Sequence, residues 1–548
     1  MSKQRWGSRF TFILAAIGSA VGLGNCWRFP GLCAKHGGGA FLLIYIVALI
    51  VLGIPLLSME IAIGRRMRGG APKALKGIHK QGEKIGWSAV FNSFVICTYY
   101  AIVFAWVIAM VFASISFGPM TDSPTGIQDA SNLFADVVIQ TTWDVSFLGA
   151  GGNIPIWMLL AGVAAWGLIY YCIRNGAASV SKVVKYTVFI PVILLVVLAL
   201  KGFIANPYLG EAMYTLFIPD WSAFADPTIW IDAFGQVFYS LSIMMAIMFA
   251  YGSYLNNDSN VATDTLIIAM SDMLISVLSA IVLFSTMYSS GMTVADMSTS
   301  GIGTAFIIYP MAIVQFTPIG WINSIFGVIF YLTLATLAID SAFSIAEGVS
   351  KAFSDKLGVD QKKVTKRVVL IMACISVIFL TGAGLGWLDI VDNWTNMFNL
   401  IIIGVAECIL VGWFFKPSKV WEDINRNTKK YRMPKWWFIA SVKFIAPVIL
   451  AFFCGWNLVN LFMKGGYGYP LWAEILGGWL ITAISISAGF IMQFITTKNK
   501  KIRKMVELTE RYEKTWDEMD YNLIEDDKAL NDENVNESVT EQTANEEA

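Results

Sequence analysis

The stretch Gly18-Ser19-Ala20-Val21-Gly22-Leu23-Gly24-Asn25 interrupts the first apolar run of this chain, which begins after Arg9 and ends at Arg28. Glycine weakens the interior of a helix and leaves backbone amide and carbonyl groups free. Hydrocarbon tolerates such groups only where they line a protein cavity or bind a ligand. We therefore expect a membrane helix that breaks near mid-bilayer at an ion or substrate site. The Gly18-x-x-x-Gly22 spacing also suits a close helix-packing seam.

The composition excludes a soluble protein. Of 548 residues, 56% are hydrophobic and 14% are charged, and the mean hydropathy is +0.61. Segments of roughly 18 to 28 apolar residues can cross a bilayer, and we count about twelve of them. The expected fold class is therefore all-α and integral to the membrane. The spans are expected near residues 10–34, 40–63, 87–116, 154–172, 180–202, 229–254, 262–289, 321–350, 366–384, 392–415, 436–462 and 471–495.

Basic residues predict the topology, because Lys and Arg in short loops stay on the cytoplasmic side. They precede the first span and separate spans two and three and spans four and five, whereas residues 117–153, 203–231 and 285–323 contain none. We expect a multi-pass protein of the cell (plasma) membrane with both termini in the cytoplasm. From Met505 onward the chain has 15 acidic and 3 basic residues, which predicts a disordered, solvated tail.

Transporters often contain two halves of opposite membrane orientation, with interrupted helices at matching positions. Five spans after the first interruption, Gly235-Gln236-Val237-Phe238-Tyr239-Ser240-Leu241-Ser242 interrupts another apolar stretch. We therefore expect a 5+5 inverted repeat with broken helices 1 and 6. The expected units are an N-terminus (1–9), a first repeat with spans one to five (10–202), a second repeat with spans six to ten (203–415), spans eleven and twelve (416–495) and the acidic tail (496–548).

Five acidic residues stand out within the expected spans, with no basic residue at similar depth to pair with them. Ionisable groups at membrane depth are costly and are functional candidates by default. Oxygen ligands suit hard cations, so sodium or a proton could supply the missing charge. The five residues are Glu60, Asp272, Asp340, Glu347 and Glu407.

Several of these acids have a second interpretation. Glu60 could equally cap freed backbone amides, and Glu347 and Glu407 could be structural or could line a gate. The favoured ion site is Asp340-Ser341, because with Ser344 it places several oxygens on neighbouring helix positions.

The first span resembles that of the neurotransmitter:sodium symporter family, which includes a bacterial leucine transporter. The resemblance runs from Arg5-Trp6-Gly7-Ser8-Arg9 through residues 18–30 to Gly37-Gly38-Gly39-Ala40-Phe41. It continues at residues 53–56, Met59-Glu60, Tyr99-Tyr100, 235–238, 305–310 and 337–341, and covers residues 3 to 465. Because this family is an example of the inverted-repeat principle, the repeat argument is not independent of the resemblance.

The resemblance implies two sodium sites beside an amino-acid pocket. The first sodium site would comprise Ala20, Asn25, Ser240 and Asp272, and the second Gly18, Val21, Leu337, Asp340 and Ser341. The substrate site would comprise Ala20, Leu23, Gly24, Ile96, Tyr100, Tyr239, Ser240, Ser242, Met245, Ser341 and Ile345. Arg28 and Asp392 would form the extracellular gate, and Lys3 or Arg5 would form the cytoplasmic latch with Trp6 and Asp355.

Local departures from the family pattern refine the expected substrate. Gly22 stands where amine-transporting relatives have aspartate, so the substrate should bring its own carboxylate. Asp272 stands where most relatives have asparagine, and Ser276 lacks the glutamate that replaces chloride in some members. We expect Asp272 to supply that charge and transport to be independent of chloride. Met244 and Met245 stand where relatives often have glycine and an aromatic residue, and methionine is adaptable, so an apolar amino acid is favoured.

The expected function is sodium-coupled uptake of a neutral, hydrophobic amino acid by alternating access. The alternatives are a sodium- or proton-coupled carrier for another zwitterion, such as an osmolyte or an omega-amino acid, and a membrane-embedded nutrient receptor. An enzyme is not expected, since no nucleophile, base or metal cluster accompanies His36 and His79. The expected partners are the amino acid, Na⁺ and the bilayer, and no nucleic acid; the oligomeric state stays open.

Overall fold

The computed structural model describes residues 5–141, 153–205, 207–292, 301–428, 431–464, 466, 468–495 and 514–519. Throughout these residues the regular elements are helices, and none is a strand. Nine helices are long and apolar enough to cross a membrane, or ten when the bent pair Arg9–Ala20 and Gly24–Lys35 counts as one span. The two other expected spans correspond to the broken pair Pro227–Ser240 and Ile247–Ser253 and to the helix Gln361–Ser376.

The helices follow the expected spans along the chain. The first part contains α1 (Arg9–Ala20), α2 (Phe29–Lys35), α3 (Gly39–Ala48), α4 (Ile54–Met67), α5 (Ala71–Ile78), α6 (Gly82–Ala113), α7 (Phe117–Thr121), α8 (Gly126–Asn132), α9 (Ile156–Ile173), α10 (Ala177–Thr187) and α11 (Phe189–Ala205). The second contains α12 (Leu209–Phe217), α13 (Pro227–Ser240), α14 (Ile247–Ser253), α15 (Val261–Ser289), α16 (Gly301–Gly303), α17 (Tyr309–Val314), α18 (Gly320–Leu357), α19 (Gln361–Ser376), α20 (Gly384–Trp394) and α21 (Leu400–Ile409). The last contains α22 (Pro417–Asn425), α23 (Lys435–Ala440), α24 (Ala446–Lys464), α25 (Leu471–Glu474) and α26 (Leu480–Phe494).

Short π-helical or 3₁₀ turns continue many of these helices without ending the span. The π-helical turns, which are wider than α-helical turns, often occur at functional sites. The π-helical turns are Gly24–Arg28, Leu49–Gly53, Leu133–Val138, Thr304–Ile308, Thr395–Asn399, Leu410–Phe414, Ser441–Ile445 and Ile475–Trp479, and the 3₁₀ turns are Ser114–Ser116, Trp221–Ala225 and Val377–Leu380.

The broken helices occupy the centre of the bundle. α1 packs against α10, α15 and α18, and α14 packs against α4 and α18. The spans Gly39–Met67 and Gly82–Thr121 are 72% buried over their most apolar windows, whereas Lys435–Met463 and Leu471–Phe494 are 33% buried. A helix that is apolar all round and mostly buried belongs to the core of a membrane bundle. The last two spans are mostly exposed, so they lie at the periphery of the bundle.

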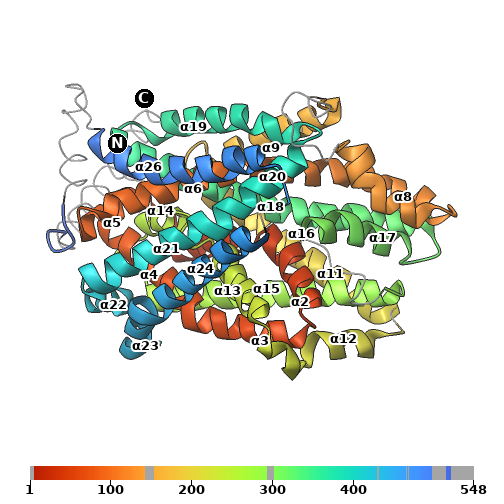
Figure 1. Ribbon diagram of the computed structural model, residues 1–548, viewed down its shortest axis with the longest axis horizontal. Helices are drawn as coiled ribbons and strands as arrows, with labels where there is room; N and C mark the ends of the chain where they lie inside the picture. Colours follow the sequence, from red (N-terminus) through yellow and green to blue (C-terminus); the bar gives the residue numbers. More distant parts are fainter. Residues whose placement is uncertain are drawn as a thin grey trace, which may run out of the picture.

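Loops rich in basic residues gather at one end of the molecule, here called the basic end. Figure 1 shows α5, α22 and α23 at one end of the long axis and α8, α12 and α17 toward the other. The first three carry Lys73, Lys76, Lys419 and Lys435. The other three lie in the segments that contain no Lys or Arg. The grouping of the basic loops expected from the sequence is therefore present in the fold.

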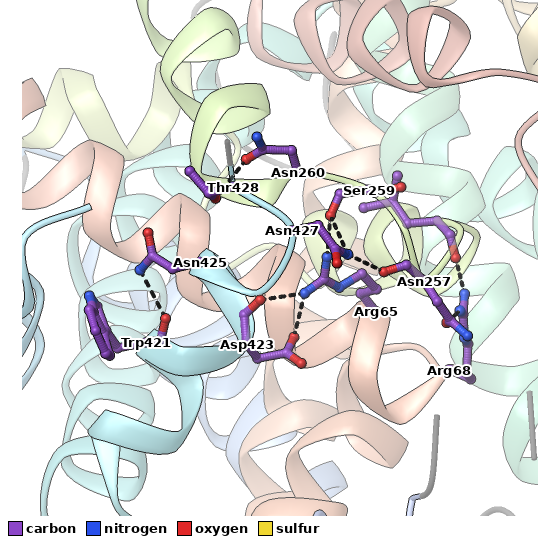
Figure 2. Close-up of polar contacts among 11 residues, drawn as sticks. Arg65, Arg68, Asn257, Ser259, Asn260, Trp421, Asp423, Asn425, Asn427 and Thr428 are labelled. Carbon is purple, nitrogen blue, oxygen red and sulfur yellow. Dashed lines mark hydrogen bonds and ion pairs between the residues drawn. The ribbon is translucent and has the colours of Figure 1, made fainter. Parts of the chain in front are cut away.

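Buried Arg65 ties three segments together at the basic end (Figure 2). Its guanidinium donates to the carbonyl oxygen of Ser259 (2.5 Å) and to the carbonyl and carboxylate oxygens of Asp423 (2.5 and 2.8 Å). Asn427 and Thr428 add bonds to the loop 257–260, and Arg68 bonds to Leu255 and Asn257. The end of α4, the loop after α14 and α22 are thus joined by charged and polar groups.

Six residues of the acidic tail lie against the basic end. Most of residues 496–548 lies outside the described residues, but 514–519 has a defined position against the basic end. Trp516 and Met519 are each only 5% exposed. Two buried apolar side chains therefore anchor this segment, and the disorder expected for the tail stays a prediction.

Candidate ion and substrate site

The first span breaks where the glycine-rich stretch predicts. α1 ends at Ala20, Val21 is extended (φ −80°, ψ 96°), and the halves on either side of the break are bent by 51°. The Asn25 side chain accepts a hydrogen bond from the freed amide of Gly22 at 2.9 Å. The interruption of the first span is therefore confirmed, and part of its backbone is satisfied by a side chain from the same stretch.

The sixth span breaks later than the sequence indicates. The stretch from Gly235 is still helical, and α13 continues to Ser240. The break comprises residues 241–246, where Ser242, Met244 and Ala246 all have positive φ (53°, 66° and 60°). Such conformations cost about 1–3 kcal/mol each for non-glycine residues, so tertiary contacts must maintain them. The expected position was wrong because these contacts cannot be read from glycine content.

A distant side chain satisfies one amide of this second break, and a side chain of the break itself bonds to the backbone of the first span. Glu60 Oε1 accepts from the amide of Met244 at 2.6 Å, and the Ser242 hydroxyl donates to the carbonyl oxygen of Ser19 at 2.9 Å. The second bond joins the two breaks directly. Glu60 could bind an ion or cap a freed amide, and the structure shows that it caps the amide of Met244.

Glycine is required at two positions in the first break because other groups approach the backbone closely. A Cβ added to Gly24 would lie 2.6 Å from Cε1 of Tyr239, and one added to Gly22 would meet the Ser341 hydroxyl and lie 3.1 Å from the Tyr100 hydroxyl. Contacts this short do not occur between real atoms without a shift. The glycines therefore let cavity side chains reach the backbone of the break.

A small cavity lies between the two breaks. It brings together all the predicted substrate residues except Leu23, whose backbone amide donates to the Tyr100 hydroxyl at 3.4 Å. Ser19, Gly22 and Asn25 also line it, although the substrate prediction did not include them. The lining residues are Ser19, Ala20, Gly22, Gly24, Asn25, Ile96, Tyr100, Tyr239, Ser240, Ser242, Met245, Ser341 and Ile345.

The cavity wall combines polar and apolar surface. Backbone of the first break and hydroxyl groups provide the polar part, and Ile96, Met245 and Ile345 provide apolar side chains. Met244, which the sequence analysis paired with Met245, does not line this cavity; its sulfur lies against Gly404 of α21. The wall thus offers backbone groups suited to the charged ends of a small zwitterion and apolar side chains suited to its side chain.

Three residues of the first predicted sodium site form one network around the carboxylate of Asp272. Asn25 Nδ2 donates to Asp272 Oδ1 at 2.7 Å, and Ser240 Oγ donates at 2.6 Å to the same oxygen and at 2.5 Å to Oδ2. Tyr45 also donates to Oδ2 at 2.9 Å. Tyr45 was missed by the sequence analysis, although a lone phenol within the apolar second span was a usable signal.

The second predicted sodium site brings α18 against the first break. Asp340 Oδ2 lies 2.7 Å from the position that a Cβ on Gly18 would take, and Asp340 Oδ1 is buried without a hydrogen-bond partner. The Ser341 hydroxyl donates to the carbonyl oxygen of Ser19 at 3.3 Å. Ser344 does not join this group, because it donates to the Asp340 carbonyl oxygen at 2.6 Å and contacts the Tyr251 hydroxyl.

A buried carboxylate oxygen without a hydrogen-bond partner has the chemistry of a hard-cation ligand. Leu337 lies three residues before Asp340 on α18, and both Val21 and Leu337 are buried where α18 packs against α1. Among the described residues no group of three or more His, Cys, Asp or Glu residues is placed to hold a metal ion. The donors available are oxygens, which suits sodium better than a transition metal.

The predicted extracellular gate residues do not form an ion pair in this structure. The Arg28 guanidinium lies over the ring of Tyr239, 5.1 Å from its centre. Asp392 instead accepts from the Tyr99 hydroxyl at 2.8 Å and from Asn396 at 2.7 Å. The structure thus places Arg28 over Tyr239, which lines the cavity, and does not join Arg28 to Asp392.

The predicted latch at the basic end is only partly assembled, and Lys3 lies outside the described residues. Trp6 donates through its indole to the Tyr251 carbonyl oxygen at 2.9 Å. Arg5 contacts Asn256 at 3.4 Å and not Asp355. Asp355 accepts from the Gly70 amide at 2.8 Å and from Lys351 at 2.7 Å.

The two remaining buried acids lie outside the cavity. Glu347 accepts from the Tyr254 hydroxyl at 2.8 Å and from Gln361 at 2.7 Å, which is a structural role. Both carboxylate oxygens of Glu407 are buried without a hydrogen-bond partner. Neither residue lines the space between the two breaks.

Comparisons with known proteins identify relatives across almost the whole chain. The sequence model of the sodium:neurotransmitter symporter family matches residues 3–122 and 119–500. An uncharacterized sodium-dependent transporter of Methanocaldococcus jannaschii is 33% identical over 92% of this chain and 99% of its own length. The sodium- and chloride-dependent glycine transporter 2 of Xenopus laevis is 26% identical over 88% of this chain and 68% of its own. The crystal structure of MhsT in complex with L-phenylalanine is similar, with a TM-score of 0.69, 25% identity and coverage of 82% of this chain and 99% of that chain.

Proposed function

Since the chain belongs to the sodium:neurotransmitter symporter family, we propose that it uses a sodium gradient to take up a neutral, hydrophobic amino acid by alternating access. The observation that carries the proposal is the cavity between the two helix breaks, with Asp340 against Gly18 and an unpartnered carboxylate oxygen beside it. The proposal places the protein in the plasma membrane with its basic end in the cytoplasm.

Two sodium ions would be carried as substrates beside the amino acid. The first would bind at Ala20, Asn25, Ser240 and Asp272 together with the amino-acid carboxylate, and the second at Gly18, Val21, Leu337, Asp340 and Ser341. Because the first ion and the carboxylate complete each other's coordination, each raises the affinity of the other by the same factor. This reciprocity is the source of coupling.

The amino-acid carboxylate would meet the freed backbone of Leu23 and Gly24 and the Tyr100 hydroxyl. Amide dipoles exposed at a helix break attract an anionic group. Ile96, Met245 and Ile345 offer an apolar wall, so a hydrophobic side chain is favoured. The phenylalanine named with MhsT is consistent with a substrate of this class.

We further propose that transport does not require chloride. Relatives such as the frog glycine transporter are named as chloride-dependent. In this chain Asp272 provides a buried negative charge next to Asn25 and Ser240, and hydroxyl and amide groups donate to it from three sides. A carboxylate at this position supplies the charge that an anion would otherwise bring.

We also propose roles for the gate residues in this transport cycle. Arg28 and Asp392 would close the outer side of the cavity when they approach each other. Arg5 or Lys3 with Asp355, and Trp6, would close the side toward the basic end.

The experiment is uptake by purified protein in liposomes, with labelled amino acids and with or without an inward sodium gradient. Accumulation of a hydrophobic amino acid only with the sodium gradient supports the proposal. Uptake driven by a proton gradient alone would favour a proton-coupled carrier. Preference for an osmolyte or omega-amino acid would revise the substrate. Saturable binding without flux under any gradient would favour a receptor.

A further inference from the structure

A second cavity lies between α6, α21 and α26, outside the site described above. It is larger than the cavity between the two breaks, and none of its lining residues belongs to that cavity. The proposed transport cycle assigns it no role. The residues that line it are Gln81, Lys84, Ile85, Ser88, Asn399, Ile402, Ile403, Ala406, Ser485, Ile486 and Phe490.

This second cavity extends from the basic end into the depth of the bundle. Lys84 lies in the first turn of α6, and its ammonium group lies 4.6 Å from the centre of the Phe490 ring. At the other end Asn399 bonds to Asn92, which lies eight residues after Lys84 on α6. The rise of an α-helix places the two ends roughly 12 Å apart along the helix axis.

One side of the second cavity is open to the surroundings of the bundle. Ile402 on α21 and Ile486 and Phe490 on α26 line it, and all three side chains are exposed. Both helices belong to candidate membrane spans, so hydrocarbon surrounds exposed apolar side chains there. A molecule dissolved in the bilayer therefore has access to the cavity between α21 and α26.

Two polar side chains that line the second cavity each have an oxygen without a hydrogen-bond partner. Asn399 is 2% exposed and its Oδ1 has no partner, and Ser485 is 1% exposed and its hydroxyl oxygen has none. Ser485 lies more than one helical turn deeper in α26 than Phe490. Unsatisfied buried polar groups are costly, and hydrocarbon supplies no partners. The deep part of the cavity therefore favours a molecule that brings a hydrogen-bonding group.

The packing of α26 explains why this space stays open. At Gly489 the helix touches α6, because an added Cβ would meet the Lys84 carbonyl oxygen and lie 2.6 Å from the Ser88 hydroxyl oxygen. Ser485 lies four residues earlier, on the same face of the helix, yet its hydroxyl reaches no partner and lines the cavity. The gap between α6 and α26 therefore widens from Gly489 toward Ser485.

The lining selects the chemistry of the ligand. Water would satisfy Asn399 and Ser485, but it would leave the apolar wall formed by Ile402, Ile403 and Ile486 without an apolar partner. A plain acyl chain would cover the wall and leave the two oxygens unsatisfied. An alcohol does both, since its hydroxyl donates one hydrogen bond and accepts another while its chain covers the apolar wall.

Polar contacts connect the deep end of the second cavity with a gate residue. Asn399 donates to Asn92 at 3.1 Å, and Asn92 donates to the Thr395 carbonyl oxygen at 3.4 Å. The Tyr99 hydroxyl lies 3.4 Å from the Thr395 hydroxyl and donates to Asp392 at 2.8 Å. Thr395 and Asn399 also begin and end one π-helical turn. A ligand at Asn399 therefore contacts the turn that directly follows the helix of Asp392.

We propose that the second cavity is a binding site for a membrane-soluble monoalcohol of medium chain length. The hydroxyl bonds to Asn399 and Ser485, and the chain lies along the isoleucines of α21 and α26 toward the basic end. While it is bound, the alcohol stabilises the π-helical turn that ends at Asn399 and slows closure of the outer gate formed by Arg28 and Asp392. The effect on the gate rests on the proposed transport function, but the binding does not.

Photolabelling of the full-length protein in detergent tests the binding. The probe is an octanol that carries a diazirine, and labelled peptides are identified by mass spectrometry. Label should concentrate on α21 and α26 beside the cavity. Octanol should displace it about tenfold better than octane at equal mole fraction in the micelles, because octane has no hydroxyl. Label spread evenly over all lipid-facing helices, equal displacement by octane, or displacement only by an anionic phospholipid would overturn the proposal.

Two variants test the position of the ligand within the cavity. Ser485→Ala should weaken labelling about fivefold. Its matched control is Thr482→Val, which removes another buried, unpartnered hydroxyl of α26 that does not line the cavity and should leave labelling unchanged. Ala406→Phe fills the cavity and should abolish labelling, and its thermal unfolding temperature verifies that it is folded. Labelling at the wild-type level in Ser485→Ala or in folded Ala406→Phe would overturn the proposal.

Uptake in liposomes tests the effect on the gate. Octanol should lower the maximal rate of sodium-driven uptake about threefold and leave the KM for the amino acid unchanged, because it binds outside the substrate cavity. Ser485→Ala should be inhibited less than the wild type. Equal inhibition by octane, or competition between octanol and the amino acid, would refute the effect on the gate. Absence of any gradient-driven uptake in the wild type would refute the proposed function and leave the labelling result standing.

Discussion

Replacing Asp272 by asparagine is expected to convert the protein from chloride-independent to chloride-dependent transport. The carboxylate is fully buried and accepts hydrogen bonds from Asn25, Ser240 and Tyr45 at 2.5 to 2.9 Å. An asparagine has nearly the same shape, but it carries no charge and only one of its two end groups accepts a hydrogen bond. At least one donor around it loses its acceptor, and the proposed first sodium ion loses its balancing charge.

The magnitude follows from electrostatics. A charge pair about 4 Å apart in a medium with an effective dielectric constant near 20 interacts by about 4 kcal/mol. The neutral side chain recovers part of this because burying it costs less than burying a carboxylate. A net loss of about 1.5–3 kcal/mol corresponds to roughly 10- to 100-fold weaker apparent sodium affinity. A chloride ion among the freed hydroxyl and amide donors should restore most of the affinity.

The assay is sodium-dependent uptake in liposomes, with chloride or gluconate as the anion. The wild type should respond equally to both anions, and Asp272→Asn should need chloride to approach the wild-type sodium affinity. Glu347→Gln is the matched control: it neutralises another buried carboxylate outside the cavity and should create no chloride requirement. The reasoning is refuted if wild-type uptake falls strongly without chloride, or if Asp272→Asn keeps its full sodium affinity in gluconate.

Three further substitutions test the packing of the site and of the basic end. Gly24→Ala should weaken substrate binding about tenfold, because the new Cβ would lie 2.6 Å from the Tyr239 ring and overpacking costs about 1–3 kcal/mol. The control Gly167→Ala, whose new Cβ meets nothing within 4 Å, should leave substrate binding unchanged. Equal substrate affinities of the two variants in a scintillation proximity assay would contradict this prediction. Glu60→Ala should lower the free energy of unfolding by about 1–3 kcal/mol, since the Met244 amide loses its acceptor. Glu60→Gln should lower it less, so the same thermal unfolding temperature for both variants would count against the capping role. Arg65→Met should lower the free energy of unfolding by about 3–5 kcal/mol, because it removes the buried guanidinium that pairs with the Asp423 carboxylate. Adding Asp423→Leu should restore part of this stability. If thermal unfolding shows no restoration, loss of the ion pair does not explain the destabilisation.

The amino-acid sequence was sufficient to predict the helical membrane architecture and most of the residues that line the cavity. The glycine-rich break of the first span, the apolar spans and the basic loops depend on local composition and length, which a bilayer converts into structure almost directly. The residues around the cavity were identified through motif resemblance, and nearly all of them line one space.

Tertiary structure decided features that depend on partners distant in the chain. The sixth span breaks at residues 241–246, where Glu60 accepts from the Met244 amide and the Ser242 hydroxyl donates to the Ser19 carbonyl oxygen. Glycine content in the span itself cannot indicate these contacts. Tyr45 joins Asp272 across 227 positions, and Ser344 faces Tyr251 and not the cavity.

The tail illustrates the same limit. Trp516 contacts α4 and α5, and Asp517 pairs with Lys419 of α22, although nothing in the acidic composition indicates these contacts. Local composition determines whether a segment can cross the membrane or stay in water. The choice among contacts of similar free energy depends on which groups the folded chain brings together, and only the tertiary structure makes that choice.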